Sequence, residues 1–246
     1  MFDHVTIRVP DRAAAEQFFE TVLGPLGIDT SYRTKAFTEW QDFMVAEASA
    51  KHPATRGLHV AFVAPSREQV DAFWQAGTDA GYADDGAPGP RPQYLKDYYG
   101  AFLRDPSGYN SIEAVHYEAH RHREQVIDHL WIRVADLDAA TSFYELVGAA
   151  AGFALRERVE DRSTFSGDAA RGASFSLVSG PPTANLHVAF GGDDDAVRRF
   201  YDGAVAAGHR GNGEPGERPH YHPGYYAAYV LDPDGNNIEV VNHNRA

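Results

Sequence analysis

Two histidines and a glutamate recur in each half of the chain on short apolar segments, where they could bind a metal ion. Glu239 is the most informative, because it lies between Ile238 and Val240 in a run that otherwise reads as buried. A carboxylate there is costly unless a cation or a hydrogen-bond network compensates it. Two imidazoles and a carboxylate on one face leave positions open for water, substrate or dioxygen. We therefore predict divalent-metal ligands, namely His4, His59 and Glu113 in the first half and His129, His187 and Glu239 in the second.

These residue types do not determine which metal ion binds. Imidazole and carboxylate ligands suit iron, manganese, zinc and nickel. The chain has no cysteine, so a disulfide framework and a thiolate metal site are both excluded. The expected cofactor is a divalent metal ion of unspecified identity.

The candidate ligands belong to an internal repeat. The segment of residues 3–9, which contains His4, recurs as residues 128–134, and residues 57–62 recur as residues 185–190. The turn Asp105-Pro-Ser-Gly108 recurs as Asp232-Pro-Asp-Gly235. Duplication alone copies any residue, but these polar residues persist where much of the surrounding sequence has diverged. We expect two domains, residues 1–118 and 126–246, joined by a charged linker near residues 117–125 whose histidines are solvated.

Each half divides into two units in which a strand, a helix and three more strands follow one another. The units are expected near residues 2–50, 57–117, 127–180 and 185–243. Val5, Ile7 and Val9 alternate with polar residues, which is typical of a strand with one polar face. Asp11 and Ser66 are expected to cap the helices that follow. The pattern predicts an α+β fold of four βαβββ units, with helices on one face of each sheet and the six candidate ligands on the other.

Composition narrows the range of partners. A net charge of −13 over 246 residues argues against nucleic acid or an anionic membrane surface. No apolar stretch approaches the roughly 18 residues that a membrane span needs. The amino terminus lacks the basic and apolar regions of a signal peptide. We expect a cytoplasmic protein with neither a nucleic-acid nor a membrane partner.

The four units, with a first-strand histidine and a last-strand glutamate, resemble the vicinal oxygen chelate superfamily. This group includes glyoxalase I, extradiol dioxygenases, fosfomycin-resistance enzymes and bleomycin-resistance proteins. The resemblance covers nearly the whole chain and is most specific around His187 and residues 218–241. It implies two cup-shaped mixed sheets with outer helices, a metal acting as Lewis acid, and a small oxygen-rich substrate bound through two adjacent oxygens. Glyoxalase I has a further acidic ligand, for which this chain offers Glu47 at best.

Residues 222–239 resemble the extradiol dioxygenase signature, in which a histidine and a tyrosine position or protonate the substrate. His222 and Tyr229 stand at those places, whereas the first half has Leu95 and Phe102. The match is imperfect, because Ala228 replaces a larger apolar residue and no histidine lies between residues 144 and 186. We expect the second-half site to be catalytic. The resemblance assigns His222 and Tyr229 as catalytic residues.

Residues near the cup mouth are candidates for binding substrate, namely Tyr221, Tyr226 and Arg218. Tyrosine supplies both an apolar ring and a hydrogen bond, and arginine can hold a carboxylate. Each has an alternative role, since the tyrosines could pack the strand and Arg218 could pin its loop. His222 could likewise be a loop residue without a role.

Two questions stay open at the level of sequence. The units could pair within each half, or the halves could exchange units so that His4 joins His187 and Glu239 while His129 joins His59 and Glu113. Either arrangement gives a monomer with an internal pseudo-dimer, or a homodimer.

The expected function is a metal-dependent enzyme, a lyase or dioxygenase. The alternatives are a non-catalytic drug-binding protein like the bleomycin-resistance proteins, or one with degenerate sites.

Overall fold

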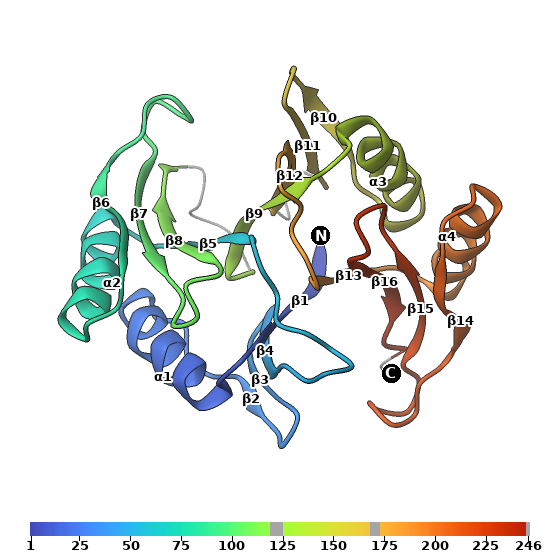
Figure 1. The fold of residues 1–246 in the computed structure, drawn as a ribbon, viewed down its shortest axis with the longest axis horizontal. Coiled ribbons are helices and arrows are strands. Elements are labelled where there is room, and N and C mark those ends of the chain that lie inside the picture. Colours follow the sequence, from blue (N-terminus) through green and yellow to red (C-terminus); the bar gives the residue numbers. More distant parts are fainter. Residues whose placement is uncertain (119–124, 168–172, 245–246) are drawn as a thin grey trace.

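The computed structural model describes residues 1–118, 125–167 and 173–244, which form two eight-stranded mixed sheets and four α-helices (Figure 1). The middle of the predicted linker, including its histidines, lies outside these residues. No helix in the described part of the chain is long and apolar enough to cross a lipid bilayer. The architecture confirms the predicted α+β fold of four βαβββ units.

The elements follow the predicted order within each unit. The first unit contains β1 (Phe2–Val9), α1 (Arg12–Leu23), the short 3-10 helix η1 (Gly24–Leu26), β2 (Tyr32–Arg33), β3 (Phe37–Trp40) and β4 (Phe43–Glu47). The second contains β5 (His59–Val63), α2 (Arg67–Asp79), β6 (Asp84–Pro90), β7 (Tyr99–Arg104) and β8 (Ser111–His116). The third contains β9 (Ile127–Val134), α3 (Leu137–Ala151), β10 (Ala154–Arg158), β11 (Arg162–Ser166) and β12 (Ser174–Ser179). The fourth contains β13 (His187–Gly191), α4 (Asp194–Ala206), β14 (Gly211–Glu217), β15 (Tyr226–Leu231) and β16 (Asn237–Asn242).

The two halves exchange units. One sheet has the order β14-β15-β16-β13-β1-β4-β3-β2, and the other has the order β10-β11-β12-β9-β5-β8-β7-β6. Antiparallel pairing of β1 with β13 joins the first unit to the fourth, with Val5 opposite Val188. Antiparallel pairing of β5 with β9 joins the second unit to the third, with Val60 opposite Leu130. Each sheet therefore combines one unit from each half, which decides between the two pairings that the sequence left open.

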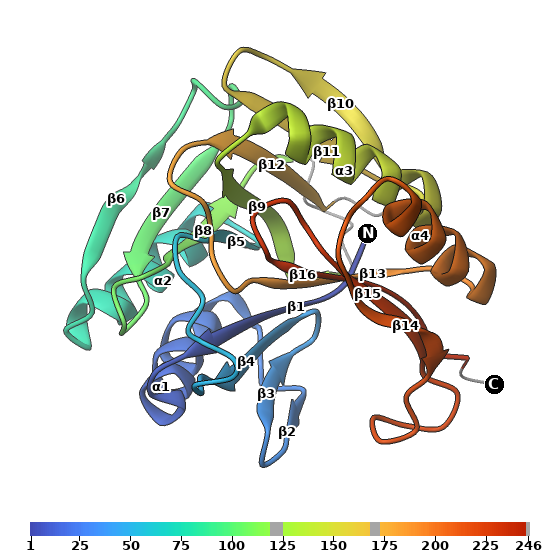
Figure 2. The same cartoon turned by 45° about the vertical axis from the view of Figure 1, so that its right-hand side comes forward.

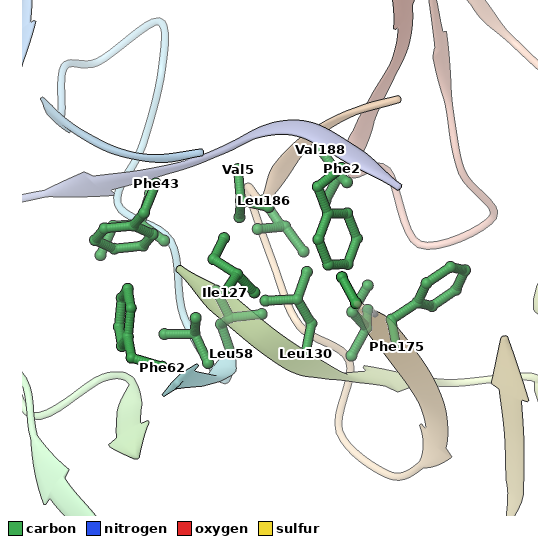
Figure 3. Packing of buried hydrophobic residues seen from close by; sticks show 14 of the residues in the cluster. Phe2, Val5, Phe43, Leu58, Phe62, Ile127, Leu130, Phe175, Leu186 and Val188 are labelled. Atoms are coloured by element: carbon green, nitrogen blue, oxygen red, sulfur yellow. The ribbon is translucent and has the colours of Figure 1, made fainter. Parts of the chain in front are cut away.

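One apolar core lies between the two sheets and their helices. Figure 3 shows side chains from both sheets interleaved at its centre, with Phe43 facing Phe62 and Phe2 above Phe175. The ring centroids of Phe43 and Phe62 are 5.1 Å apart in an edge-on arrangement. Helix α1 packs beside α2, and α3 beside α4, so the helix pairs flank this centre (Figures 1 and 2). Residues of both halves therefore contribute to one buried core.

Helix starts follow local chemistry as predicted. The side chain of Asp11 accepts a hydrogen bond from the backbone N–H of Ala14, and that of Ser66 accepts one from Gln69. Asp136 and Asp193 cap α3 and α4 in the same way. Each cap satisfies one backbone donor that a helix leaves unpaired at its start.

Candidate metal centres

Strand alternation places all six predicted ligands on the sheet faces that point away from the helices. Their strand neighbours lie in the apolar core, as predicted, namely Val5, Val60, Ile112, Leu130, Val188 and Ile238. In one sheet Ala189 lies between His4 and Glu239 in the cross-strand row, and in the other Ala61 lies between His129 and Glu113. A methyl group in the middle of each row leaves room for the longer side chains on either side to converge.

Three ligand atoms meet at the first centre, which we call the Glu239 centre. The Nε2 atoms of His4 and His187 are 3.2 Å apart. The Oε2 atom of Glu239 lies 3.1 Å from Nε2 of His187 and 3.7 Å from Nε2 of His4. The carboxylate is buried and both histidines are nearly so. His4 comes from the first half of the chain and the other two residues from the second.

The second centre, the Glu113 centre, repeats this arrangement in the other sheet. The Oε2 atom of Glu113 lies 2.9 Å from Nε2 of His59 and 3.6 Å from Nε2 of His129. Within each centre the ligand atoms lie within 4.8 Å of one another. His59 and Glu113 come from the first half, and His129 from the second.

The spacing of these atoms fits a single divalent ion. Ligands at about 2.1 Å from one ion are about 3.0 Å apart at right angles and about 3.4 Å apart in a tetrahedral arrangement. The three separations at the Glu239 centre, 3.1, 3.2 and 3.7 Å, lie close to these values. Three acceptor lone pairs brought this close repel one another unless a metal ion or protons lie between them. The donor set therefore fits a metal ion.

An aspartate beside each first-strand histidine fixes the orientation of its ring. Nδ1 of His4 lies 2.8 Å from Oδ1 of Asp3, and Nδ1 of His129 lies 2.7 Å from Oδ2 of Asp128. With Nδ1–H donating to the carboxylate, Nε2 keeps its lone pair for a metal. Sequence reasoning missed both aspartates, although the Asp-His pair is repeated in the two halves.

A β-bulge lets the aspartate and histidine share a face. Adjacent strand residues normally point to opposite faces. The pairing of β1 with β13 skips Asp3, and that of β9 with β5 skips Asp128. An extra residue of this kind re-aims a side chain. The same bulge occurs at both places, so each centre has an aspartate that contacts its first-strand histidine.

The second oxygen of each glutamate accepts a hydrogen bond from a buried tyrosine. The hydroxyl of Tyr225 donates to Oε1 of Glu239, and that of Tyr98 donates to Oε1 of Glu113, both at 2.7 Å. Each bond leaves Oε2 directed at the histidines. The sequence does not reveal these contacts, because the position of a tyrosine before a strand gives no sign of this partner.

The two centres differ in electrostatics. Burial raises the pKa of Glu113 to about 7 and lowers that of His59 to about 4. At the other centre burial opposes ionisation too, but the contact with His187 and the charge of His4 lower the pKa of Glu239 overall. Burial likewise lowers the pKa of His4, and the hydrogen bond to Asp3 and the charge of Glu239 outweigh it and raise the pKa. The Glu239 centre therefore favours the charged forms of His4 and Glu239, whereas burial at the Glu113 centre disfavours the charged forms of Glu113 and His59.

The predicted catalytic residues lie beside the Glu239 centre rather than in it. Tyr229 is the direct cross-strand neighbour of Glu239. His222 lies on the loop before β15, where its Nε2 is 2.8 Å from Nδ1 of His243. Nε2 of His243 is in turn 2.9 Å from Oδ2 of Asp3. A continuous hydrogen-bonded chain thus runs from His222 at the rim through His243 and Asp3 to His4.

The equivalent path at the Glu113 centre is different. Phe102 is the cross-strand neighbour of Glu113, where the other centre has Tyr229. The hydroxyl of Tyr117, at the position of His243, donates to Asp128 at 2.9 Å. Leu95, at the position of His222, carries no polar group. The sequence predicted that the two centres differ at the positions of His222 and Tyr229. They also differ at a third position, where the Glu239 centre has His243 and the Glu113 centre has Tyr117.

The three predicted substrate-binding residues have different surroundings. Tyr221 is exposed on the loop and its ring lies 4.8 Å from that of Tyr225, which contacts Glu239. The guanidinium of Arg218 donates to the backbone oxygens of residues 214 and 217 and lies 5.6 Å from the centre of the Tyr229 ring. Arg218 thus pins its loop, the alternative role considered for it, through contacts with backbone oxygens.

The expectation that Tyr226 lines a cup is wrong. Its hydroxyl accepts a hydrogen bond from Arg198 of α4, and its ring packs against the main core. It stands three residues from Tyr229 on the same strand, and an odd separation puts two strand residues on opposite faces. Tyr225, one residue earlier, faces the cup instead.

A pocket opens directly over the Glu113 centre. Aromatic side chains and two arginines form its wall around the ligands, and the lining residues are His59, Tyr94, Tyr98, Phe102, Arg104, Ser111, Glu113, His129, Trp131 and Arg133. Its volume is about 160 Å³. A small molecule can therefore reach this centre from outside.

The model of the Glyoxalase/Bleomycin resistance protein/Dioxygenase superfamily matches residues 1–111 and 126–240. The chain belongs to this superfamily. Glyoxalase I from Zea mays has the same fold, with a TM-score of 0.72 at 17% identity over 98% of this chain and 92% of that one. A putative dioxygenase from Bacillus subtilis matches with a TM-score of 0.67 at 13% identity, over 100% of this chain and 86% of that one. No curated protein matches the chain.

Membership of the Glyoxalase/Bleomycin resistance protein/Dioxygenase superfamily confirms the predicted resemblance over nearly the whole chain. The superfamily name joins glyoxalases and dioxygenases with drug-resistance proteins, so membership alone does not separate catalysis from binding. The two solved structures are so distant in sequence that they show the shared fold alone. The choice between functions therefore depends on the side chains of the two centres.

Proposed function

We propose that the protein is a metal-dependent enzyme that binds a small molecule through two adjacent oxygens and converts it at the Glu239 centre. The observation that carries the proposal is the convergence of His4, His187 and Glu239 at separations that suit one ion. A drug-binding protein without a metal has no use for this buried charge, which is costly when uncompensated. The identity of the metal, among iron, manganese, zinc and nickel, is left to measurement.

The ligand set would hold the ion at one side and leave its other side to the substrate. Bound there, a divalent ion supplies Lewis-acid polarisation of substrate oxygens. Asp3 and Asn237 hold the rings, since Nδ1 of His187 lies 3.1 Å from the backbone oxygen of Asn237. Tyr225 holds Oε1 of the carboxylate. Each of the three ligand side chains is thus oriented by a contact to the atom that does not face the proposed ion.

Tyr229 is proposed to supply a hydrogen bond to the substrate. Burial and the nearby Glu239 carboxylate raise the pKa of its phenol, so the group keeps its proton at neutral pH. A neutral phenol facing the cup can donate to a substrate oxygen as negative charge develops on it. His222 is proposed to act with it, either by contacting substrate at the rim or by exchanging a proton with solvent.

The assay that tests this proposal compares turnover in two matched variants. Glu239→Ala and Glu113→Ala each remove one carboxylate, and the metal-loaded proteins are offered small molecules with two adjacent oxygens while product and dioxygen uptake are followed. We expect Glu239→Ala to abolish turnover and Glu113→Ala to retain it. Dioxygen uptake would indicate an oxygenase, and product without uptake a lyase or isomerase.

The opposite pattern, with turnover lost in Glu113→Ala and kept in Glu239→Ala, would contradict the assignment of the catalytic centre. Tight binding of the same molecules without turnover, in protein that carries metal, would favour the drug-binding alternative.

A further inference from the structure

The pocket over the Glu113 centre has a wall that the other cup lacks. Trp131 stands two residues after the ligand His129, where the other cup has Thr6 after His4. Phe102 lies across from Glu113, and Arg104 two residues further along β7 takes the place of Leu231 on β15. The Trp131 ring and the Arg104 guanidinium therefore belong to this cup alone, although the ligand sets of the two cups are the same.

The rings form a partly open aromatic box. The ring of Trp131 lies 5.7 Å from that of His59 and 5.8 Å, edge-on, from that of Tyr94. Phe102 lies 5.9 Å from His59 on the opposite side. Trp131 is only half-buried, so part of its surface faces the pocket. Exposed aromatic surface in a concave site is the usual contact for another ring.

Two arginines line the pocket, and they differ in whether they have an ion-pair partner among the described residues. Arg104 is paired with Asp85 at 2.8 Å. Arg133 donates one hydrogen bond, to the backbone oxygen of Gly57 at 3.2 Å, and makes no ion pair with any residue in the described ranges. Its remaining N–H groups stand free at the rim of a pocket in a chain whose net charge is −13. A guanidinium of this kind is suited to a carboxylate or another planar anion.

The size of the pocket restricts what fits between the rings and the arginine. Its volume of about 160 Å³ is close to that of apolar cavities that hold one benzene ring. Larger ring systems would have to extend into solvent.

We propose that the pocket formed by Trp131, Phe102 and Arg133 over the Glu113 centre binds a single aromatic ring that carries an anionic group. The ring lies among Trp131, Phe102 and Tyr94, and the anion meets Arg133 at the rim. The other cup has Thr6 in place of Trp131 and Leu231 in place of Arg104, and it does not bind this class of molecule. The two cups then serve different ligands, and this specificity does not depend on which metal, if any, the Glu113 centre holds.

The test uses three small probes and the protein's own reporter. The full chain contains three tryptophans, so nitrogen-15-labelled protein gives three indole signals, and Trp131→Phe identifies the one in the pocket. Benzoate combines ring and anion, benzamide lacks the charge, and cyclohexanecarboxylate lacks the aromatic ring. Titrations are run on chelator-treated and on metal-loaded protein.

We expect benzoate to shift the Trp131 signal saturably in both forms, and each of the other two probes to bind at least about tenfold more weakly. Arg133→Gln should weaken benzoate by about tenfold or more, and Arg133→Lys by less. Trp131→Thr removes the reporter, so its affinity for benzoate is measured by calorimetry, where we expect a loss of about tenfold against the wild type. Arg8→Gln, which changes the equivalent arginine of the other cup, should leave benzoate binding unchanged.

Equal binding of benzoate and benzamide would overturn the inference, as would benzoate binding that ignores Arg133→Gln or needs the metal. The inference would also be overturned if benzoate did not move the Trp131 signal at concentrations up to about 10 mM. None of these results bears on turnover at the Glu239 centre, so this inference and the proposed function can fail separately.

Discussion

At the scale of single residues, the most consequential contacts are those behind the ligands. Asp3 and Asp128 hold the Nδ1 atoms of His4 and His129, and Tyr225 and Tyr98 hold one oxygen of each glutamate. Contacts of this kind fix both the tautomer and the direction of a ligand. The six ligands were predictable from the sequence because strand alternation gave them one face. Their supporting groups were not, since hydrogen-bond partners depend on the fold.

Replacing Asp3 by Asn should weaken metal binding at the Glu239 centre. The amide is neutral and no longer favours the tautomer that exposes Nε2, so we expect a loss of about ten- to a hundredfold in affinity there. Metal titration of Asp3→Asn in a Glu113→Ala background reads this centre alone. Asp128→Asn in the same background is the matched control and should leave the affinity as it was. Equal effects of the two variants would refute the orienting role.

Replacing His222 by Ala should lower turnover without emptying the Glu239 centre. His222 reaches His4 only through His243 and Asp3, so its loss removes a rim group and spares the ligands. We expect a loss in kcat of about a hundredfold or more if it transfers a proton, with metal content unchanged. Metal analysis alongside kinetics checks this, and a variant that loses its metal would show that His222 supports the centre instead.

Metal affinity of the Glu113 centre should rise with pH up to about 7. The buried carboxyl has its pKa raised to about 7, and a protonated carboxyl cannot ligate, so below that value a proton competes with the metal. His59, with its pKa lowered to about 4, does not compete in this range. Titrations of Glu239→Ala between pH 5.5 and 8.5 should show about a tenfold gain per pH unit, levelling above 7. A flat profile would contradict the buried, protonated state of Glu113.

At the scale of elements, the strands β1 and β9 show what a sequence pattern can and cannot tell. Alternation predicted their apolar and polar faces correctly, and the capping residues marked where the following helices begin. The bulges at Asp3 and Asp128 were not predictable, because a period-two pattern puts those residues in the core. Tyr226 was misplaced for a related reason, since the consecutive tyrosines where β15 begins do not reveal which one faces the cup.

Turn residue Asp42, between β3 and β4, connects the two sheets at a buried point. Its Oδ1 accepts hydrogen bonds from the backbone N–H groups of Val126 and Ile127 at the start of β9, while its Oδ2 has no partner among the described residues. Burial raises the pKa of this carboxyl to about 7 from an ordinary value of 3.8. The folded protein therefore holds a proton that the unfolded chain releases.

The protonated Asp42 should accordingly add to the free energy of unfolding at low pH, and this contribution should be lost as the pH rises from about 4 through 7. The free energy of unfolding of the wild type, taken relative to that of Asp42→Asn, should fall by on the order of 1 kcal/mol per pH unit between pH 5 and 7. Urea unfolding of metal-free protein at several pH values measures this difference. If the difference between the two proteins stays constant with pH, Asp42 is ionised throughout and its burial has been misjudged.

At the scale of the whole molecule, the exchange of units makes each centre a joint product of both halves. His4 meets two residues from the second half, and His129 meets two from the first. The sequence could not decide this, because pairing within halves uses the same six residues and the same alternation. The shared core between the sheets explains how the exchange is held, since residues of all four units pack into it.

The most direct test of the account is the metal content of paired variants of the full chain. We predict about two equivalents of divalent metal in the wild type and about one in the double variant His4→Ala with Glu239→Ala, since both residues serve one centre. The double variant His4→Ala with Glu113→Ala should bind none, because it breaks both. The account would be contradicted if the wild type bound no metal after exposure to each candidate ion. It would also be contradicted if the variant with His4→Ala and Glu113→Ala kept one equivalent, since one centre would then have escaped both changes.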